Sequence, residues 1–216
     1  MTEKKTGILF DLDGTLWDPS SAAAASWNIV LDRYEDAVRK ATPEWMHRLM
    51  GKTMTEIEKI FLDYLPPVRR HELMNECFEY ENTYIAEHGG TLYGGVKKTL
   101  EVLHADYHLS VVSNCQEGYI PSFFKAHGMN HYFDDYEENG RTGKNKAGNI
   151  RLVIERNRLE HAVYVGDTMG DYNSAMEAGI PFIHASYGFG EVPEGIPKVM
   201  DISQVPQIMK TMIWLP

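Results

Sequence analysis

The sequence predicts an α/β protein: a Rossmann-like, three-layer core built on a parallel sheet, with an all-helical subdomain inserted into it. From residue 92 onwards, short apolar runs alternate with segments of helical periodicity. Strands separated by helices of this length form parallel sheets with right-handed crossovers. An earlier apolar run at residues 7–10 belongs to the same sheet, but four helical patterns follow it without a convincing strand. A plain crossover needs only about thirty residues, so we expect an inserted helical unit.

The predicted division assigns residues 1–16 and 92–216 to the α/β core domain, and residues 17–91 to the helical domain. The two joins fall at residues 16–20 and 88–95. Glycines in the second join suit a hinge.

The first strand, residues 7–10, is an apolar run fit for burial on both faces. In the insertion, Pro43 and Thr53 are typical helix starts, and Gly51 is a typical helix end. The insertion helices are expected from residue 22 through 38, from 43 through 49, from 54 towards 64, and through 73–85.

The second half of the chain supplies the remaining elements of the sheet domain. Helices are expected at residues 96–104, 119–127, 147–157, 173–178 and 202–212. Strands are expected at residues 108–113, 132–133, 162–166 and 181–184.

Composition limits the classes of function. The chain has 216 residues, of which 43% are hydrophobic, and a formal net charge of −10, so we expect a soluble globular protein that repels nucleic acid and anionic membranes. The two cysteines, Cys77 and Cys115, have no zinc or disulfide spacing. Because no apolar signal segment or membrane-spanning run is found, a cytoplasmic location is expected.

The first strand ends in two carboxylates, Asp11 and Asp13, followed by Gly14. Two like charges this close repel, so their position at the mouth of a buried strand indicates a compensating cation. A plain Asp-Gly turn after the strand is the alternative.

Two other strands also end in polar residues, one in Ser113-Asn114 and one in the run Gly-Asp-Thr-Met-Gly-Asp at residues 166–171. Ligands of open parallel sheets bind beyond the carboxyl ends of the strands, so these ends should converge. Singly, each is explained by a strand end, a turn or a helix cap.

These motifs together resemble the haloacid dehalogenase-like hydrolase superfamily: Asp-Leu-Asp-Gly-Thr-Leu, a strand-terminal Ser-Asn, a lysine before a helix, and Gly-Asp-Thr-Met-Gly-Asp, in that order over nearly the whole chain. The insertion resembles the helical cap of the subgroup that contains phosphoglycolate phosphatases and β-phosphoglucomutases. The resemblance implies that Asp11 is the nucleophile and forms an aspartyl-phosphate. It implies that Asp13 is the general acid and then the base.

The resemblance also implies a magnesium site. Asp11, the backbone carbonyl of Asp13, and Asp167 would supply hard oxygen ligands, which favour Mg²⁺. Asp171 would support these ligands from the first turn of a helix, where an acid is also favoured by the helix dipole alone.

For the transferred phosphoryl group, the resemblance implies donors from the Ser113 hydroxyl, the backbone N–H groups of Leu12 and Asn114, and one lysine. Two lysines compete. Lys146-Ala-Gly-Asn-Ile fits one family form, which favours Lys146 over Lys144, and the other lysine would be a solvated surface charge.

Weaker candidates lie elsewhere. His47, Arg48 and Lys52 flank the Gly51 turn, where related caps contact substrates, although exposed helix charge explains them too. The loop at residues 186–190 either edges the site or is an ordinary Gly-rich loop. The tryptophans are expected in the cap core or in interdomain packing; they are Trp17, Trp27 and Trp45.

The first functional hypothesis is a Mg²⁺-dependent phosphatase of a small phosphate monoester, a monomer or weak homodimer with a small-molecule substrate. A phosphomutase resembling β-phosphoglucomutase is the second hypothesis, because it uses the same four motifs. A catalytically idle binding or regulatory protein is the third, and the intact motif set argues against it. A dehalogenase is disfavoured, since in that branch the position of Asp13 is typically not an aspartate and no metal is used.

Overall fold

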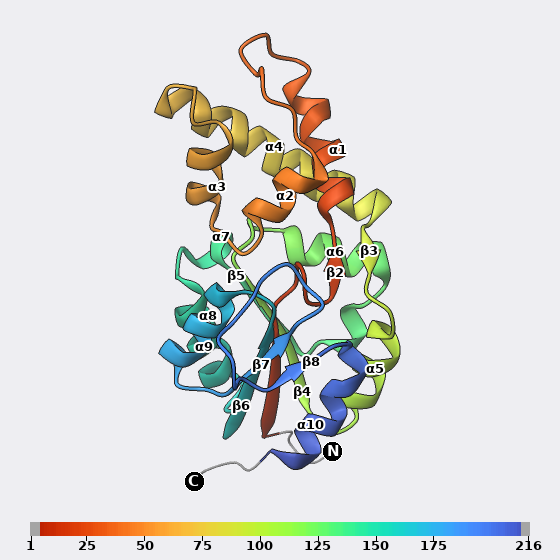
Figure 1. Cartoon of the computed structure of the whole chain (residues 1–216). Coiled ribbons are helices and arrows are strands. Elements are labelled where there is room, and N and C mark those ends of the chain that lie inside the picture. Colours follow the sequence, from red (N-terminus) through yellow and green to blue (C-terminus); the bar gives the residue numbers. More distant parts are fainter. Residues whose placement is uncertain (1–4, 213–216) are drawn as a thin grey trace.

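The computed structural model describes residues 5–212. Its centre is a six-stranded parallel sheet with the strand order β5-β4-β1-β6-β7-β8 (Figure 1). The strands are β1 (Thr6–Phe10), β4 (His108–Ser113), β5 (Asp135–Glu138), β6 (His161–Gly166), β7 (Phe182–Ala185) and β8 (Lys198–Val199). Phe10 of β1 lies opposite Val111 of β4 and Val165 of β6. The first strand is therefore central, as its doubly apolar composition predicts.

Helices cover both faces of the sheet, which confirms the predicted three-layer α/β class (Figure 1). Alternation along β1 explains the layers, because successive side chains point to opposite faces. Ile8 and Phe10 belong to the apolar cluster with α5, α6 and α10, whereas Leu9 belongs to the cluster with α8 and α9. The helices are α5 (Val96–His104), α6 (Tyr119–His127), α7 (Asn139–Thr142), α8 (Lys146–Arg156), α9 (Met169–Ala178) and α10 (Val205–Thr211).

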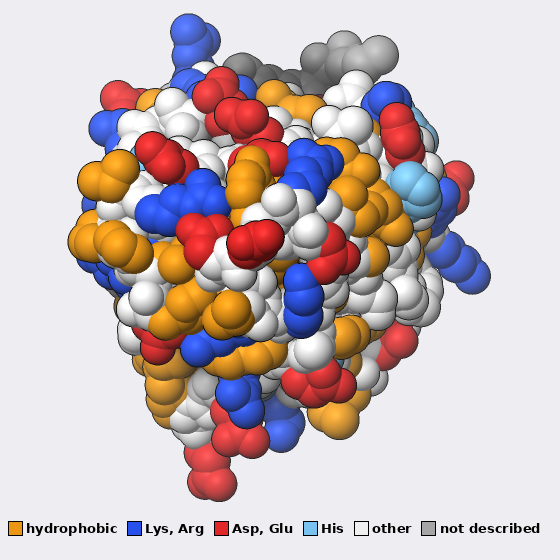
Figure 2. All heavy atoms as spheres, turned by 90° about the horizontal axis from the view of Figure 1, so that it is seen from above, with side chains coloured by type: hydrophobic (Ala, Val, Ile, Leu, Met, Phe, Trp, Pro, Cys, Tyr) orange, Lys and Arg blue, Asp and Glu red, His pale blue; other side chains and the backbone are white. Residues whose placement is uncertain are grey.

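Four helices follow β1 in the chain, before α5, and pack together beyond one end of the sheet (Figure 1). They are α1 (Ser20–Leu31), α2 (Pro43–Leu49), α3 (Met54–Phe61) and α4 (Pro67–His88), and we refer to them as the helical insertion. Their apolar cluster is distinct from those of the sheet and centres on aromatic pairs such as Trp27–Phe61. On the end formed by the insertion, acidic and basic side chains are interspersed with hydrophobic ones (Figure 2). Several of these charges are paired, as in Arg69–Asp36.

The chain enters and leaves the helical insertion through a two-stranded antiparallel ribbon, β2 (Trp17–Asp18) with β3 (Thr91–Leu92). Neither strand was anticipated, because two-residue strands leave no periodic signal. The ribbon ties both joins together at one place.

The first insertion helix is shorter than expected, and the predicted extension to residue 38 is wrong. The helix ends at Leu31. Val38 is 74% exposed, so it is not part of the apolar face that the spacing suggested. The side chain of Asn28 instead holds the returning chain, by bonds of 2.9 Å to both the N–H and the C=O of Ala41. These tertiary contacts replace further helical turns.

The predicted strand at residues 132–133 is also wrong. Asn130–Tyr132 forms a 3-10 turn, and the strand that pairs with β4 begins at Asp135. This strand is mostly acidic, so a search for apolar runs does not find it. Its charges are balanced by Arg156, which binds Asp135 and lies 2.7 Å from Glu137. An edge strand can carry such charges because only one side of it is paired.

Two further differences concern the last quarter of the chain. Helix α9 starts at Met169 rather than at residue 173, because Thr168 and Asp171 form a capping box. Strand β8 was not anticipated.

Within residues 5–212, no helix has the length and apolar character needed to cross a membrane. Cys77 and Cys115 are buried free thiols.

Candidate active site

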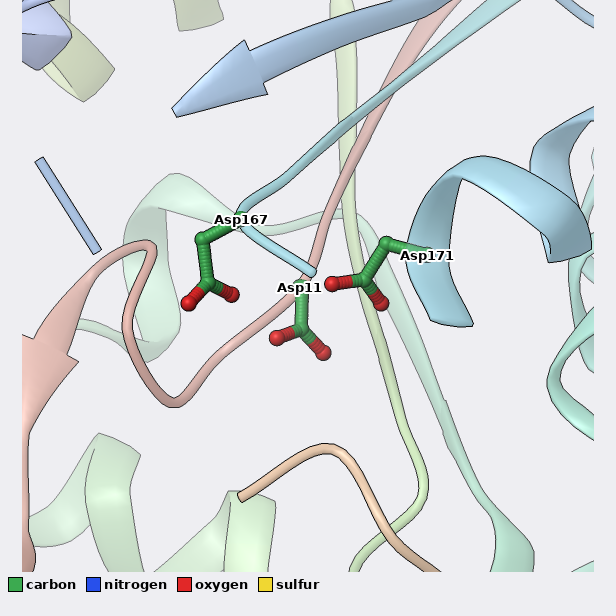
Figure 3. A group of neighbouring side chains, drawn as sticks. All are labelled: Asp11, Asp167 and Asp171. Carbon is green, nitrogen blue, oxygen red and sulfur yellow. The ribbon is translucent and has the colours of Figure 1, made fainter. Parts of the chain in front are cut away.

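Three buried carboxylates converge at the carboxyl edge of the sheet: Asp11 at the end of β1, Asp167 just after β6, and Asp171 on α9 (Figure 3). One oxygen from each lies within 4.8 Å of the others. Adjacent parallel strands β1 and β6 bring the first two together, and the first turn of α9 adds the third. The site therefore lies where an open α/β sheet binds its ligands.

Glycines make this approach possible. Gly14 has φ of +88°, and a Cβ there would lie 2.3 Å from Asp167 Oδ2. At Gly188, in the loop after β7, a Cβ would lie 2.4 Å from the Cβ of Asp167. Any larger residue at either position would displace the Asp167 carboxylate, so the glycines are part of the site's construction.

Lys146 is the cation of the site. Its Nζ lies 2.7 Å from Asp11 Oδ1 and also donates to Asp171 Oδ1, and the residue is 3% exposed. Burial disfavours the charge, but the carboxylates of Asp11 and Asp171 hold the pKa of Lys146 well above its ordinary value. Lys144 is exposed and lies outside this cluster. The lysine favoured by the sequence is thus the one that faces Asp11.

Asp11 is stabilised as an anion only in part. Burial raises its pKa to about 6 and the charge of Asp171 adds to this, while Lys146 and the N–H of Leu12 act in the opposite direction. The Asp11 carboxylate is therefore mostly ionised at neutral pH.

Asp13 has different surroundings. Its Oδ1 accepts hydrogen bonds from Trp17 Nε1 at 2.7 Å and from Tyr119 Oη at 3.1 Å. Burial raises the pKa of Asp13 to about 8, and the negative charge of Asp11 contributes to the rise. Two carboxylates two residues apart thus have separated pKa values, which is the pattern of an acid–base pair with divided roles.

Asp167 has one carboxylate oxygen that a cation could bind. Its Oδ2 accepts the N–H of Phe189 at 2.7 Å, but its buried Oδ1 has no hydrogen-bond partner within residues 5–212. Burial, reinforced by the charge of Asp171, raises its pKa to about 8. This unpartnered oxygen of Asp167 and the neighbouring carboxylate of Asp11 together form a ligand set suited to a hard divalent cation such as Mg²⁺. The residues present therefore fit a magnesium ion.

The expected phosphate-binding groups lie nearby. Ser113 and Asn114 line the same cavity as Asp11 and Asp13. Asn114 Nδ2 donates to the carbonyl of Gly51 at 3.0 Å, which links the end of β4 to the helical insertion. Asn114 therefore joins the sheet edge to the turn between α2 and α3.

That cavity lies between the sheet edge and the helical insertion. The insertion contributes mainly apolar side chains, including Met46, Met54 and Ile57, together with Glu81 and Lys52. A molecule bound at Asp11 would be enclosed by this wall.

The three basic residues of the insertion that were weaker candidates have different surroundings. Of the three basic residues near the Gly51 turn, only Lys52 lines the cavity. His47 stacks on Phe189 with 4.6 Å between ring centroids, and Arg48 lies over the ring of Trp45. The contact of His47 packs the insertion against the loop that contains Phe189, whereas the contact of Arg48 lies within α2.

The loop at residues 186–190 adjoins the site through Phe189, which binds Asp167. Trp27 and Trp45 pack in the helical insertion, as expected.

Sequence reasoning missed three polar residues of the site: Trp17, Tyr119 and Glu81. Trp17 was assigned to packing alone, although it also binds Asp13. Tyr119 starts α6 and Glu81 lies within α4, and no spacing rule relates either residue to Asp13. Only the tertiary fold brings these residues together.

A parallel sheet with its carboxylates and a buried lysine at the carboxyl edge defines an α/β enzyme that works on a ligand at that edge. Residues 8–185 match the family model described as haloacid dehalogenase-like hydrolase, and the chain belongs to this family. The resemblance inferred from the motifs is confirmed, as is the prediction of an enzyme.

Curated relatives and solved structures agree. A phosphoglycolate phosphatase of Vibrio cholerae is 30% identical over 197 residues, covering 84% of each chain. One from Rhodobacter capsulatus is 28% identical and covers 96% of this chain and 98% of its own. The crystal structure of a predicted phosphoglycolate phosphatase from Haemophilus somnus superposes with a TM-score of 0.82 at 22% identity, covering 97% and 99% of the two chains. The fold is thus shared over nearly all of the chain.

Proposed function

We propose that the protein is a Mg²⁺-dependent phosphatase that hydrolyses a small phosphate monoester through an aspartyl-phosphate on Asp11. The observation that carries the proposal is the buried contact of 2.7 Å between Asp11 and Lys146, at the edge where one oxygen of Asp167 has no hydrogen-bond partner in the described part of the chain. The names of the curated relatives support phosphate-ester hydrolysis.

In the first step, the Asp11 carboxylate attacks phosphorus and the leaving alcohol departs. Asp11 is mostly ionised at neutral pH and needs no base to activate it. The free oxygens of the transferred group would be met by Lys146, the Ser113 hydroxyl, and the N–H groups of Leu12 and Asn114. Lys146 rather than Lys144 has this role, because Lys146 is the buried lysine that faces Asp11.

Asp13 supplies and recovers the proton. With a pKa of about 8 it holds a proton at neutral pH and can give it to the leaving oxygen. The resulting carboxylate then accepts a proton from the water that hydrolyses the aspartyl-phosphate. Trp17 and Tyr119 fix the carboxyl group for both transfers.

A magnesium ion would be held by Asp11, Asp167 and the backbone carbonyl of Asp13, with Asp171 in support. When bound, it supplies positive charge that lets an anionic ester approach the carboxylates. Residues 17–91 are then the cap, which excludes water other than the attacking one while the ester is bound.

The test is a panel of esters with and without Mg²⁺: p-nitrophenyl phosphate, phosphoglycolate, and sugar and nucleotide monophosphates. We expect release of inorganic phosphate that depends on Mg²⁺ and is lost in Asp11→Asn. Normal Mg²⁺ binding without turnover of any ester contradicts the proposal. Transfer of phosphate between two positions of one sugar, without net release, would instead identify a phosphomutase.

A further inference from the structure

The cavity wall formed by the helical insertion carries a buried acid. Glu81 of α4 is 5% exposed and lines the cavity that contains Asp11 and Asp13. Its Oε2 accepts hydrogen bonds from Trp27 Nε1 at 2.9 Å and Gln116 Nε2 at 3.2 Å. These two donors hold the carboxyl group in place.

The second oxygen of Glu81 is the one open to a ligand. Within residues 5–212, Oε1 accepts no hydrogen bond and no basic side chain forms a salt bridge with Glu81. Burial raises the pKa of Glu81 to about 7. Leaving a buried carboxyl oxygen without a hydrogen bond costs free energy, so a ligand that donates a hydrogen bond to Oε1 would be stabilised.

Apart from Lys52, the rest of that wall is apolar. Trp27, Met46, Met54 and Phe78 line the cavity together with Glu81, and Trp27 donates to it. Apolar surfaces contribute burial but cannot solvate a charge. A second anionic group on the substrate that met Glu81 would therefore find no compensating charge among these apolar side chains.

Among the described residues that line the cavity, Lys52 is the only basic one. It follows Gly51, whose carbonyl accepts from Asn114. A Cβ placed at Gly51 would also lie 3.4 Å from Thr168, beside the carboxylate cluster. The backbone next to Lys52 therefore lies at the sheet edge, beside Asn114 and Thr168, and within residues 5–212 the Lys52 ammonium group forms no salt bridge with Glu81.

We propose that the leaving alcohol of the substrate is uncharged and carries a hydroxyl group that donates to Glu81 Oε1, and that esters with a carboxylate at this position are rejected. This inference rests on the proposed phosphatase function, and it narrows the substrate class to hydroxylated, neutral alcohols. Phosphoglycolate, the substrate in the names of the relatives, falls outside that class.

A matched pair of esters tests it. In 2-hydroxyethyl phosphate, a hydroxymethyl group replaces the carboxylate of phosphoglycolate. At pH 8, where Glu81 is mostly ionised, we expect kcat/KM for 2-hydroxyethyl phosphate to exceed that for phosphoglycolate at least tenfold. Ethyl phosphate also has an uncharged leaving alcohol but no donor for Glu81. It should therefore be a poorer substrate than 2-hydroxyethyl phosphate.

Glu81→Gln should reduce the preference for 2-hydroxyethyl phosphate over phosphoglycolate at least tenfold. The amide removes the repelling charge, and its oxygen can still accept from Trp27. The control is Glu79→Gln, which removes the same charge from an exposed position of the same helix and should leave the preference unchanged. Melting temperatures and circular dichroism establish that both variants are folded.

Three results would overturn the inference: equal or faster turnover of phosphoglycolate by the wild type, an unchanged preference in folded Glu81→Gln, or a selective loss of phosphoglycolate turnover in Lys52→Met. The last would mean that Lys52 receives a substrate carboxylate. Absence of turnover with every ester, p-nitrophenyl phosphate included, contradicts the proposed function itself, and the two failures are thereby distinguished.

Discussion

The indole Nε1 of Trp17 donates a hydrogen bond to Asp13 Oδ1 at 2.7 Å. Trp17 is fully buried and belongs to β2, the strand through which the chain enters the helical insertion. Since β2 pairs with β3, the strand through which the chain returns, both joins border the residue that holds Asp13. The orientation of the proposed general acid is therefore coupled to the base of the insertion.

Trp17→Phe tests this coupling. Phenylalanine keeps an aromatic ring against Phe123 but removes the donor to Asp13. One hydrogen bond contributes about 1 kcal/mol, so we expect kcat to fall roughly fivefold to tenfold for alkyl phosphates. The loss should be smaller for p-nitrophenyl phosphate, because its leaving group needs little help from an acid. Equal losses for both ester types would show that Trp17 supports only the fold.

The two lysines should behave very differently. Lys146→Ala leaves the buried carboxylates of Asp11 and Asp171 without their cation. Removing one partner of a buried ion pair typically costs about 3–5 kcal/mol, so we expect a lower free energy of unfolding and turnover reduced at least a hundredfold. Lys144→Ala, at an exposed position, is the matched control and should keep the free energy of unfolding and the turnover of the wild type. Equal, mild effects of the two substitutions on phosphate release would refute the assignment of Lys146.

Stability should depend on pH and Mg²⁺ together. In the metal-free protein, the pKa of Asp11 is about 6 and that of Asp167 about 8, both raised chiefly by burial above the unfolded value of 3.8. Between about pH 4 and 8 the folded state thus binds more protons than the unfolded state, and these groups make stability fall as pH rises. Mg²⁺ binds the deprotonated carboxylates and should reverse this loss.

Thermal unfolding with and without Mg²⁺ measures the effect. We expect Mg²⁺ to raise the melting temperature clearly at pH 8 and little at pH 5. Asp167→Asn removes the orphaned carboxylate oxygen and should flatten the pH dependence of the metal-free protein while weakening the response to Mg²⁺. An equal Mg²⁺ response at both pH values would contradict a site made of these carboxylates.

Sequence periodicity was sufficient for several elements of the sheet domain. Helices α5 and α6 and strand β4 have the expected bounds, because their apolar spacing coincides with their buried faces. Prediction failed where tertiary contacts replace local preference. Strand β5 has acidic residues whose charges are paired by Arg141 and Arg156, both outside the strand.

The candidate site divides in the same way. Strand ends and the loops that follow them carry Asp11 and Asp167, and parallel pairing brings such ends together, so their convergence was predictable. Trp17, Tyr119 and Glu81 reach the site from a ribbon and two helices whose relative placement depends on packing between the insertion and the sheet. No local pattern encodes that placement.

The most direct test of the proposed chemistry is to trap phosphorylated Asp11. Asp13→Asn with p-nitrophenyl phosphate and Mg²⁺ should form the aspartyl-phosphate, because this leaving group departs without an acid, and should hydrolyse it slowly, because the base is gone. Acid quenching and peptide mass mapping should find the mass of one phosphoryl group on Asp11, and none in Asp11→Asn. Phosphorylation at another residue, or near-normal turnover by Asp11→Asn, would contradict the proposed mechanism.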